Sequence, residues 1–145
     1  DEATRLIEGS PSHLDEVNHY LFAGKCDFTQ PFNALVAGGG TGDAAIMLAQ
    51  HLADRGEAGQ VTYLDLSTAS RKIAEGRAKI RGLKNITFLT GSLLDLPKMD
   101  LPLFDYIDCC GVLHHLERMF ERVAGGERAS IPCKMRLRLW PPETL

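Results

Sequence analysis

The sequence predicts a doubly wound, mostly parallel α/β sheet. Short apolar runs alternate with stretches of helical periodicity at the spacing of βαβ units. The first apolar run ends in the glycine-dense turn Gly38–Gly42, and polar or glycine residues follow the later runs. The chain has 145 residues, of which 44% are hydrophobic and 24% charged, so one globular domain with its own core is expected.

Each element is predicted from its apolar spacing and its end signals. Strands are expected at residues 33–37, 61–64, 85–89 and 104–110. Helices are expected at about residues 12–23, from 45 to Gly56, and from the N-cap Ser67 to Gly82. In the third of these helices, the face formed by Ala69, Ile73, Gly76 and Ile80 is expected to be buried. In the first helix, Tyr20 and Phe22 are expected to pack on the helix face, with a lid over a ligand as the alternative.

The ends of the predicted strands indicate a ligand site. Ligands of parallel α/β sheets bind at the carboxyl ends of the strands. Gly38–Gly42, Asp65, Ser92 and 111–115 all follow such ends. A glycine turn between a strand and a helix lets bare backbone approach a nucleotide, so NAD, FAD and S-adenosylmethionine are all candidates. The frame Gly40–Ala45 fits GxGxxA, but Asp43 would lie near a pyrophosphate, and the ammonium group of a methionine moiety tolerates that carboxylate better.

Four blocks of the chain resemble, in order, the motifs of class I S-adenosylmethionine-dependent methyltransferases. They are 34–42 with its GxGxG motif, 61–67 with a strand and its terminal acid, 86–97 with a strand and the adenine loop, and 104–116 with a strand and its turn. The resemblance covers about residues 33–117 and implies a Rossmann-like fold with an incomplete C-terminal half. It divides the chain into an N-terminal helical segment (1–32), a cofactor-binding core (33–117) and an atypical basic tail (118–145).

The resemblance also implies roles for individual residues. The acid Asp65 would accept hydrogen bonds from the ribose hydroxyls, Ser92 and the Leu93 backbone would hold the adenine amine, and Leu66 would cover one face of the adenine. The implied cofactor-binding set is Ala37, Gly38, Gly39, Gly40, Gly42, Asp65, Leu66, Ser92, Leu93 and Gly111. The implied reaction is in-line displacement of the sulfonium methyl group, for which a dedicated base can be dispensable. His114 and His115 are the candidates for such a base.

Two departures from the family pattern stand out. The family usually has an acid two residues before the first glycine, where this chain has Val36, so a weaker affinity or a substitute role for Asp43 is expected. After Leu116 the remaining family elements are not recognisable. Residues 131–140 could form an edge strand, or the tail could be foreign to this fold, such as a frame-shifted or alternatively spliced end. The start at Asp1 rather than Met suggests a cut N-terminus.

Two other functions stay open at this point. One is an NAD(P)-dependent oxidoreductase that uses Gly40, Gly42 and Asp65, although no Tyr-x-x-x-Lys pair is visible. The other is a truncated, inactive nucleotide-binding fragment, which the atypical tail suggests.

Composition and charge set expectations for partners. The net charge of -3, and cysteines without a CxxC pair, favour no metal and a cytoplasmic protein. No apolar stretch approaches the length of a membrane span, so no membrane is expected. Residues 118–145 carry 6 basic and 3 acidic residues, without the interleaved aromatics of a nucleic-acid site. The methyl acceptor is unknown, and an exposed edge after the fourth strand would favour a homodimer.

Overall fold

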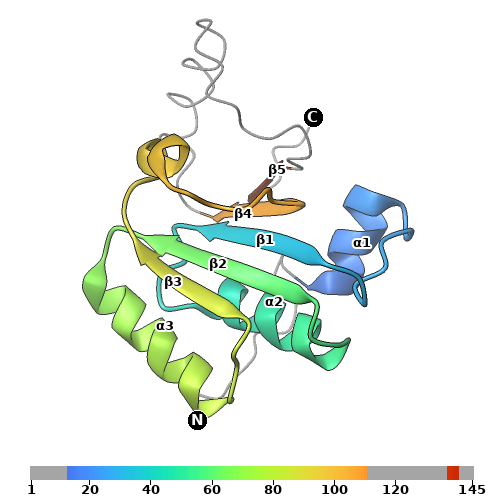
Figure 1. The fold of residues 1–145 in the computed structure, drawn as a ribbon, viewed down its shortest axis with the longest axis horizontal. Coiled ribbons are helices and arrows are strands. Elements are labelled where there is room, and N and C mark those ends of the chain that lie inside the picture. Colours follow the sequence, from blue (N-terminus) through green and yellow to red (C-terminus); the bar gives the residue numbers. More distant parts are fainter. Residues whose placement is uncertain (1–12, 111–136, 141–145) are drawn as a thin grey trace, which may run out of the picture.

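A computed structural model describes residues 13–110 and 137–140, which form a five-stranded sheet with helices (Figure 1). The strands are β1 (Phe32–Ala37), β2 (Gly59–Asp65), β3 (Ile86–Thr90), β4 (Tyr106–Cys110) and β5 (Leu137–Trp140). The helices are α1 (Leu14–Phe22), α2 (Asp43–Asp54), α3 (Thr68–Ile80) and the short 3-10 helix η1 (Leu93–Lys98). The predicted parallel α/β sheet is therefore confirmed.

The strand order is β3-β2-β1-β4-β5, and every neighbouring pair is parallel. The chain moves outward from β1 to β3 and then returns to β4 on the other side of β1. This reversal creates a switch point between β1 and β4, and ligands of open α/β sheets bind beside the carboxyl ends of the strands at such a point. The glycine turn after β1 lies at this position.

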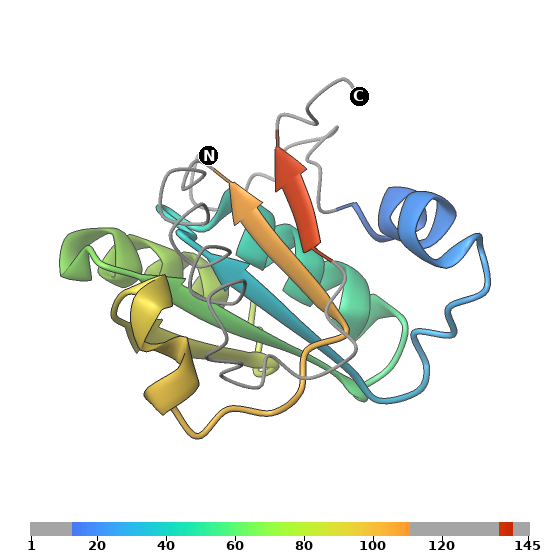
Figure 2. The same cartoon turned by 90° about the horizontal axis from the view of Figure 1, so that it is seen from above.

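The expected edge strand in the tail is confirmed for residues 137–140. β5 pairs along β4, from Ile107 opposite Leu137 to Cys110 opposite Trp140, and Figure 2 shows the two strands side by side. The prediction of an exposed edge at β4 is therefore wrong. The backbone groups of β4 pair with β5, so β5 and β3 are the two outer strands of the described sheet. A homodimer is therefore no longer expected from an unpaired β4 edge.

The core has one cluster on each face of the sheet, because side chains alternate along the strands. Phe32, Ala34 and Val36 of β1 face α2 and α3, while Leu35 and Ala37 face η1 and the loop that precedes β4. The predicted buried face of α3 is wrong. Ile73 and Ile80 are exposed, and the buried residues of α3 are Ala74, Arg77 and Ala78, whose small or paired side chains let α3 approach the sheet closely.

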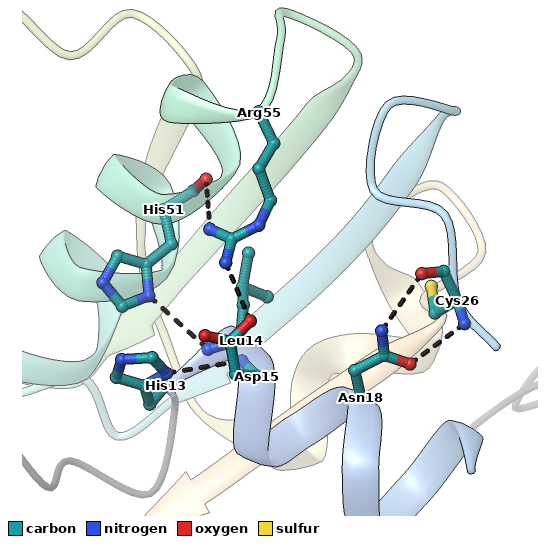
Figure 3. Close-up of polar contacts among 7 residues, drawn as sticks. All are labelled: His13, Leu14, Asp15, Asn18, Cys26, His51 and Arg55. Atoms are coloured by element: carbon teal, nitrogen blue, oxygen red, sulfur yellow. Dashed lines mark hydrogen bonds and ion pairs between the residues drawn. The ribbon is translucent and has the colours of Figure 1, made fainter. Parts of the chain in front are cut away.

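The helix α1 packs against the far end of α2 from the glycine turn (Figure 3). The backbone N–H of Leu14 donates to His51 Nδ1 at 3.5 Å, and Arg55 pairs with Asp15 at 3.0 Å. His51 and Arg55 lie 8 and 12 residues after Asp43, the first residue of α2, so the two contacts are about 12 and 18 Å along the helix from it. This position does not suit α1 as a lid over the turn.

Side chains of α1 close the loop that leads to β1. The amide of Asn18 donates to the carbonyl of Cys26 and accepts from its N–H, at 3.1 and 2.9 Å (Figure 3). Phe22 packs edge-to-face on Phe32, as expected of the helix face, with ring centres 5.9 Å apart. The packing expected for Tyr20 is wrong, because this residue is 71% exposed. No helix among the described residues is long and apolar enough to cross a membrane.

Candidate functional site

The glycine turn after β1 is hydrogen-bonded to the end of β2. The N–H groups of Gly38 and Gly39 both donate to the carbonyl of Leu64, at 2.8 and 3.2 Å. Gly38, Gly40 and Gly42 have φ angles of 69°, 55° and 100°, which lie in the left-handed region that favours glycine. Gly42 then forms the N-cap of α2, so the turn delivers a helix N-terminus directly beside the strand ends.

Asp65 ends β2 and joins the strand to the turn. Its Oδ2 accepts from the N–H of Gly40 at 2.8 Å, and its Oδ1 accepts from the N–H of Ser67 at 2.7 Å. These two bonds fix the plane of the half-buried carboxylate. Each carboxylate oxygen has a further lone-pair direction, so the group can still accept two hydroxyl donors. The ribose of a nucleoside carries two neighbouring hydroxyl groups that could donate to these two positions.

Tyr63 of β2 contacts the glycine turn through both its hydroxyl and its ring. Its hydroxyl donates to the carbonyl of Gly40 at 2.5 Å, and its ring occupies the space where a Cβ on Gly39 would lie. Burial of the phenol, together with the charge of Asp65, raises the pKa of Tyr63 to about 12. The hydroxyl is therefore a protonated hydrogen-bond donor throughout the neutral range.

Residues of α3 support the same turn from the helical side. Arg77 is 5% exposed, and its Nη1 donates to the carbonyl of Thr41 at 2.9 Å and to Asp43 Oδ1 at 2.8 Å. A Cβ on Gly42 would lie 2.9 Å from the Cβ of Ala74. Asp43, which could substitute for the acid missing at Val36, therefore has its charge balanced by a buried guanidinium.

The loop after β3 reaches the same end of the sheet. The N–H of Gly91 donates to the carbonyl of Asp65 at 2.9 Å, so this loop lies against the end of β2. Ser92 caps η1, because its hydroxyl accepts from the N–H of Leu94 at 3.2 Å, and Leu93 is buried in the core. Leu66 follows Asp65 and is 65% exposed, so its side chain is accessible beside this carboxylate.

The structure thus brings most of the predicted cofactor-binding residues to one end of the sheet. Ala37 ends β1 and is buried, while the glycines, Asp65 and the loop of Ser92 are linked by the hydrogen bonds above. Gly111, His114 and His115 lie outside the described residues. The binding roles of the predicted cofactor residues and the catalytic roles of His114 and His115 stay predictions. Among the residues that the structure describes, no group of His, Cys, Asp or Glu could hold a metal ion.

Sequence reasoning missed two residues of this site, Tyr63 and Arg77. Tyr63 lies within the predicted strand 61–64 and Arg77 within the predicted helix that ends at Gly82, and neither residue is assigned a role from the sequence alone. One signal points to Tyr63. The GxGxG pattern leaves position 39 free, and Gly39 has no left-handed φ, so its glycine indicates that a bulky neighbour, here the ring of Tyr63, fills the space of a side chain. The burial of Arg77 depends on Asp43, which lies 34 residues earlier in the chain.

A family model described as "Methyltransferase domain" matches residues 35–126, which is more than half of the chain. The chain belongs to this methyltransferase domain family. No curated protein sequence matches the chain. Membership of this family indicates S-adenosylmethionine as the cofactor. The cradle of bare glycines and the Asp65 carboxylate fits this group.

Solved structures support the fold of the methyltransferase domain. PKMT2 from Rickettsia typhi, in complex with AdoHcy, is 21% identical with a TM-score of 0.58 over 79% of this chain and 22% of its own. Precorrin 8W decarboxylase from Methanobacterium thermoautotrophicum is 16% identical with a TM-score of 0.60, over 96% and 69%. MtNAS, solved as a point mutant, is 15% identical with a TM-score of 0.61, over 89% and 44%. The chain thus spans less than half of PKMT2 and of MtNAS.

Proposed function

We propose that this chain binds S-adenosylmethionine at the glycine turn and transfers its methyl group to an acceptor nucleophile. The observation that carries the proposal is the bond between Asp65 and the N–H of Gly40. It joins an acid suited to ribose hydroxyls to a turn that a cofactor can approach closely, both at the carboxyl ends of neighbouring strands. Membership of the methyltransferase domain family and the AdoHcy complex of PKMT2 support this assignment.

The described residues divide the work of binding between them. Asp65 would accept from the ribose hydroxyls, because its orientation is already fixed by Gly40 and Ser67. Leu66 would contact a face of the adenine, because its apolar side chain is accessible directly after Asp65. The loop at Ser92 is held next to Asp65 by Gly91, and it would supply polar groups to the adenine edge.

The chemistry needs little from the protein beyond alignment. The cofactor supplies an electrophilic methyl group on a sulfonium when it is bound. The protein must hold the donor still and in line with the acceptor, and such positioning accounts for much of the rate of bimolecular reactions on enzymes. A turn held by Tyr63, Asp65 and Arg77 provides a rigid seat for the donor. His114 and His115 remain candidates for a base that deprotonates the acceptor.

The experiment compares two aspartate variants by calorimetric titration with S-adenosylhomocysteine. Asp65→Asn keeps the size of the side chain but removes its charge and one acceptor, so we expect affinity to fall about 10- to 100-fold. Asp95→Asn is the matched control, because Asp95 is an exposed residue of η1 on the neighbouring loop. Equal affinity of both variants would overturn the proposed role of Asp65.

A further inference from the structure

The peptide groups of Gly40 are held from both sides by the same strand. The N–H of Gly40 donates to Asp65 Oδ2 at 2.8 Å, and the carbonyl of Gly40 accepts from the hydroxyl of Tyr63 at 2.5 Å. Tyr63 and Asp65 are two residues apart on β2 and therefore lie on the same side of the sheet. Gly40 cannot move without breaking a bond to one of these two side chains.

Gly39 is a glycine for a different reason from its neighbours. Gly38, Gly40 and Gly42 have positive φ angles, whereas Gly39 does not, so its backbone would accept an L side chain. A Cβ on Gly39 would, however, overlap Cε2 of Tyr63 and lie 2.5 Å from its Cδ2. The ring of Tyr63 therefore takes the volume that a side chain at position 39 would need. Residues 39 and 63 are matched in size.

We propose that Tyr63 is a positioning residue for the cofactor, which fixes the glycine turn and, through Gly40, the Asp65 carboxylate. This inference rests on the proposed function, because it names what holds the binding site in shape. A turn that is already ordered before binding loses less conformational freedom when the ligand arrives, and the affinity is higher by that amount. Tyr63 itself is fully buried behind the turn, so it acts through Gly39 and Gly40.

The first test removes only the hydroxyl. Tyr63→Phe keeps the ring against Gly39 but deletes the bond to the Gly40 carbonyl. We expect the affinity for S-adenosylhomocysteine to fall on the order of 3- to 10-fold, the worth of one hydrogen bond. In the ligand-free protein, we expect the amide hydrogen of Gly40 to exchange faster by a similar factor, because the turn opens more often.

The matched control is Tyr106→Phe. Tyr106 is also fully buried, but it starts β4 and lies opposite Ala34, whereas Tyr63 lies opposite Val36, nearer the turn. We expect Tyr106→Phe to change neither the affinity nor the exchange of the Gly40 amide, whatever it does to overall stability. If the two variants behave alike in both measurements, Tyr63 has only a general packing role and the inference is wrong.

The second test exchanges the two matched volumes. Gly39→Ala should lower the affinity about tenfold or more in the native background, because the new methyl group and the ring of Tyr63 cannot both fit. In a Tyr63→Val background the ring is gone, so Gly39→Ala should cost less than about twofold. Equal costs in the two backgrounds would show that the ring does not set the identity of residue 39.

Failure of this inference can be told apart from failure of the proposed function. If the native chain does not bind S-adenosylhomocysteine, the proposed function fails, and the role of Tyr63 toward the cofactor fails with it. The exchange of the Gly40 amide still decides whether the tyrosine holds the turn. If the native chain binds and Tyr63→Phe binds equally well, only the inference fails.

Discussion

Arg77 of α3 and Asp43, the first residue of α2, form an ion pair with 2.8 Å between Nη1 and Oδ1. The same nitrogen of Arg77 donates to the carbonyl of Thr41 in the glycine turn at 2.9 Å. One buried side chain therefore ties α3, the start of α2 and the turn together. The aspartate side chain is 37% exposed, so water screens part of this interaction, and the pair has one buried and one partly solvated partner.

Replacing Arg77 should destabilise the fold. Arg77→Met keeps the aliphatic length but leaves the Thr41 carbonyl and the Asp43 carboxylate without this donor. Because Asp43 is partly solvated, we expect a loss below that of a fully buried pair, about 2 kcal/mol in the free energy of unfolding measured with urea.

A surface ion pair provides the control for Arg77. Asp15→Asn breaks the pair with Arg55, in which the side chain of Asp15 is 75% exposed. Such exposed pairs contribute little, so we expect a change of less than about 0.5 kcal/mol. Similar losses for the two variants would mean that the pair beneath the turn is no more important than a surface contact.

The glycine at 42 should be intolerant of a side chain for two reasons. Its φ of 100° is unfavourable for alanine, and a Cβ would lie 2.9 Å from Ala74. Gly82→Ala is the control, because Gly82 also has a positive φ of 66° but has open space around it. We expect Gly42→Ala to lower the free energy of unfolding by about 1–3 kcal/mol more than Gly82→Ala, because of the contact with Ala74 and the less favourable φ. Equal effects would show that α3 does not crowd the turn.

The contact between α1 and α2 should weaken in acid. His51 Nδ1 accepts from the N–H of Leu14, which requires that nitrogen to be unprotonated. Burial, followed by the nearby charges of His13 and Arg55, lowers the pKa of His51 below 6.5, while Asp54 and Asp15 act in the opposite direction. The unfolded chain then binds more protons than the folded chain below about pH 6.5. The contribution of His51 is therefore complete above that pH and is lost as the pH falls toward the folded pKa.

The measurement for His51 is urea unfolding at a series of pH values from about 7.5 to 5. Asn at position 51 can still accept from the N–H of Leu14 but cannot take up a proton. We therefore expect the stability of His51→Asn to fall less steeply with acid than that of the native protein. Identical slopes for the two proteins would assign the acid sensitivity to other groups.

Much of the fold could be predicted because its signals are local. Apolar runs of strand length, Ser67 as the cap of α3 and glycines at the ends of helices are each read from a few neighbouring residues. Ser67 does accept from the N–H of Ser70, as such a cap should. The glycine turn and Asp65 could be placed together because parallel strands bring their carboxyl ends to one edge.

The misread parts depend on contacts between distant residues. Periodicity identified α3 but placed Ile73 and Ile80 inward, because the residues that pack are the smaller Ala74 and Ala78. The reason is tertiary, since α3 must come within contact of Gly42. The edge of the sheet was misplaced for a similar reason, because β5 is supplied by a segment that begins 27 residues after β4 ends.

Calorimetric titration of the native chain with S-adenosylhomocysteine, with NADH as the comparison ligand, tests the central claim most directly. The glycine turn held by Asp65, Tyr63 and Arg77 predicts saturable binding of S-adenosylhomocysteine with one site per chain and no binding of NADH. Binding of NADH instead, or of neither ligand, would contradict the assignment of this site to S-adenosylmethionine.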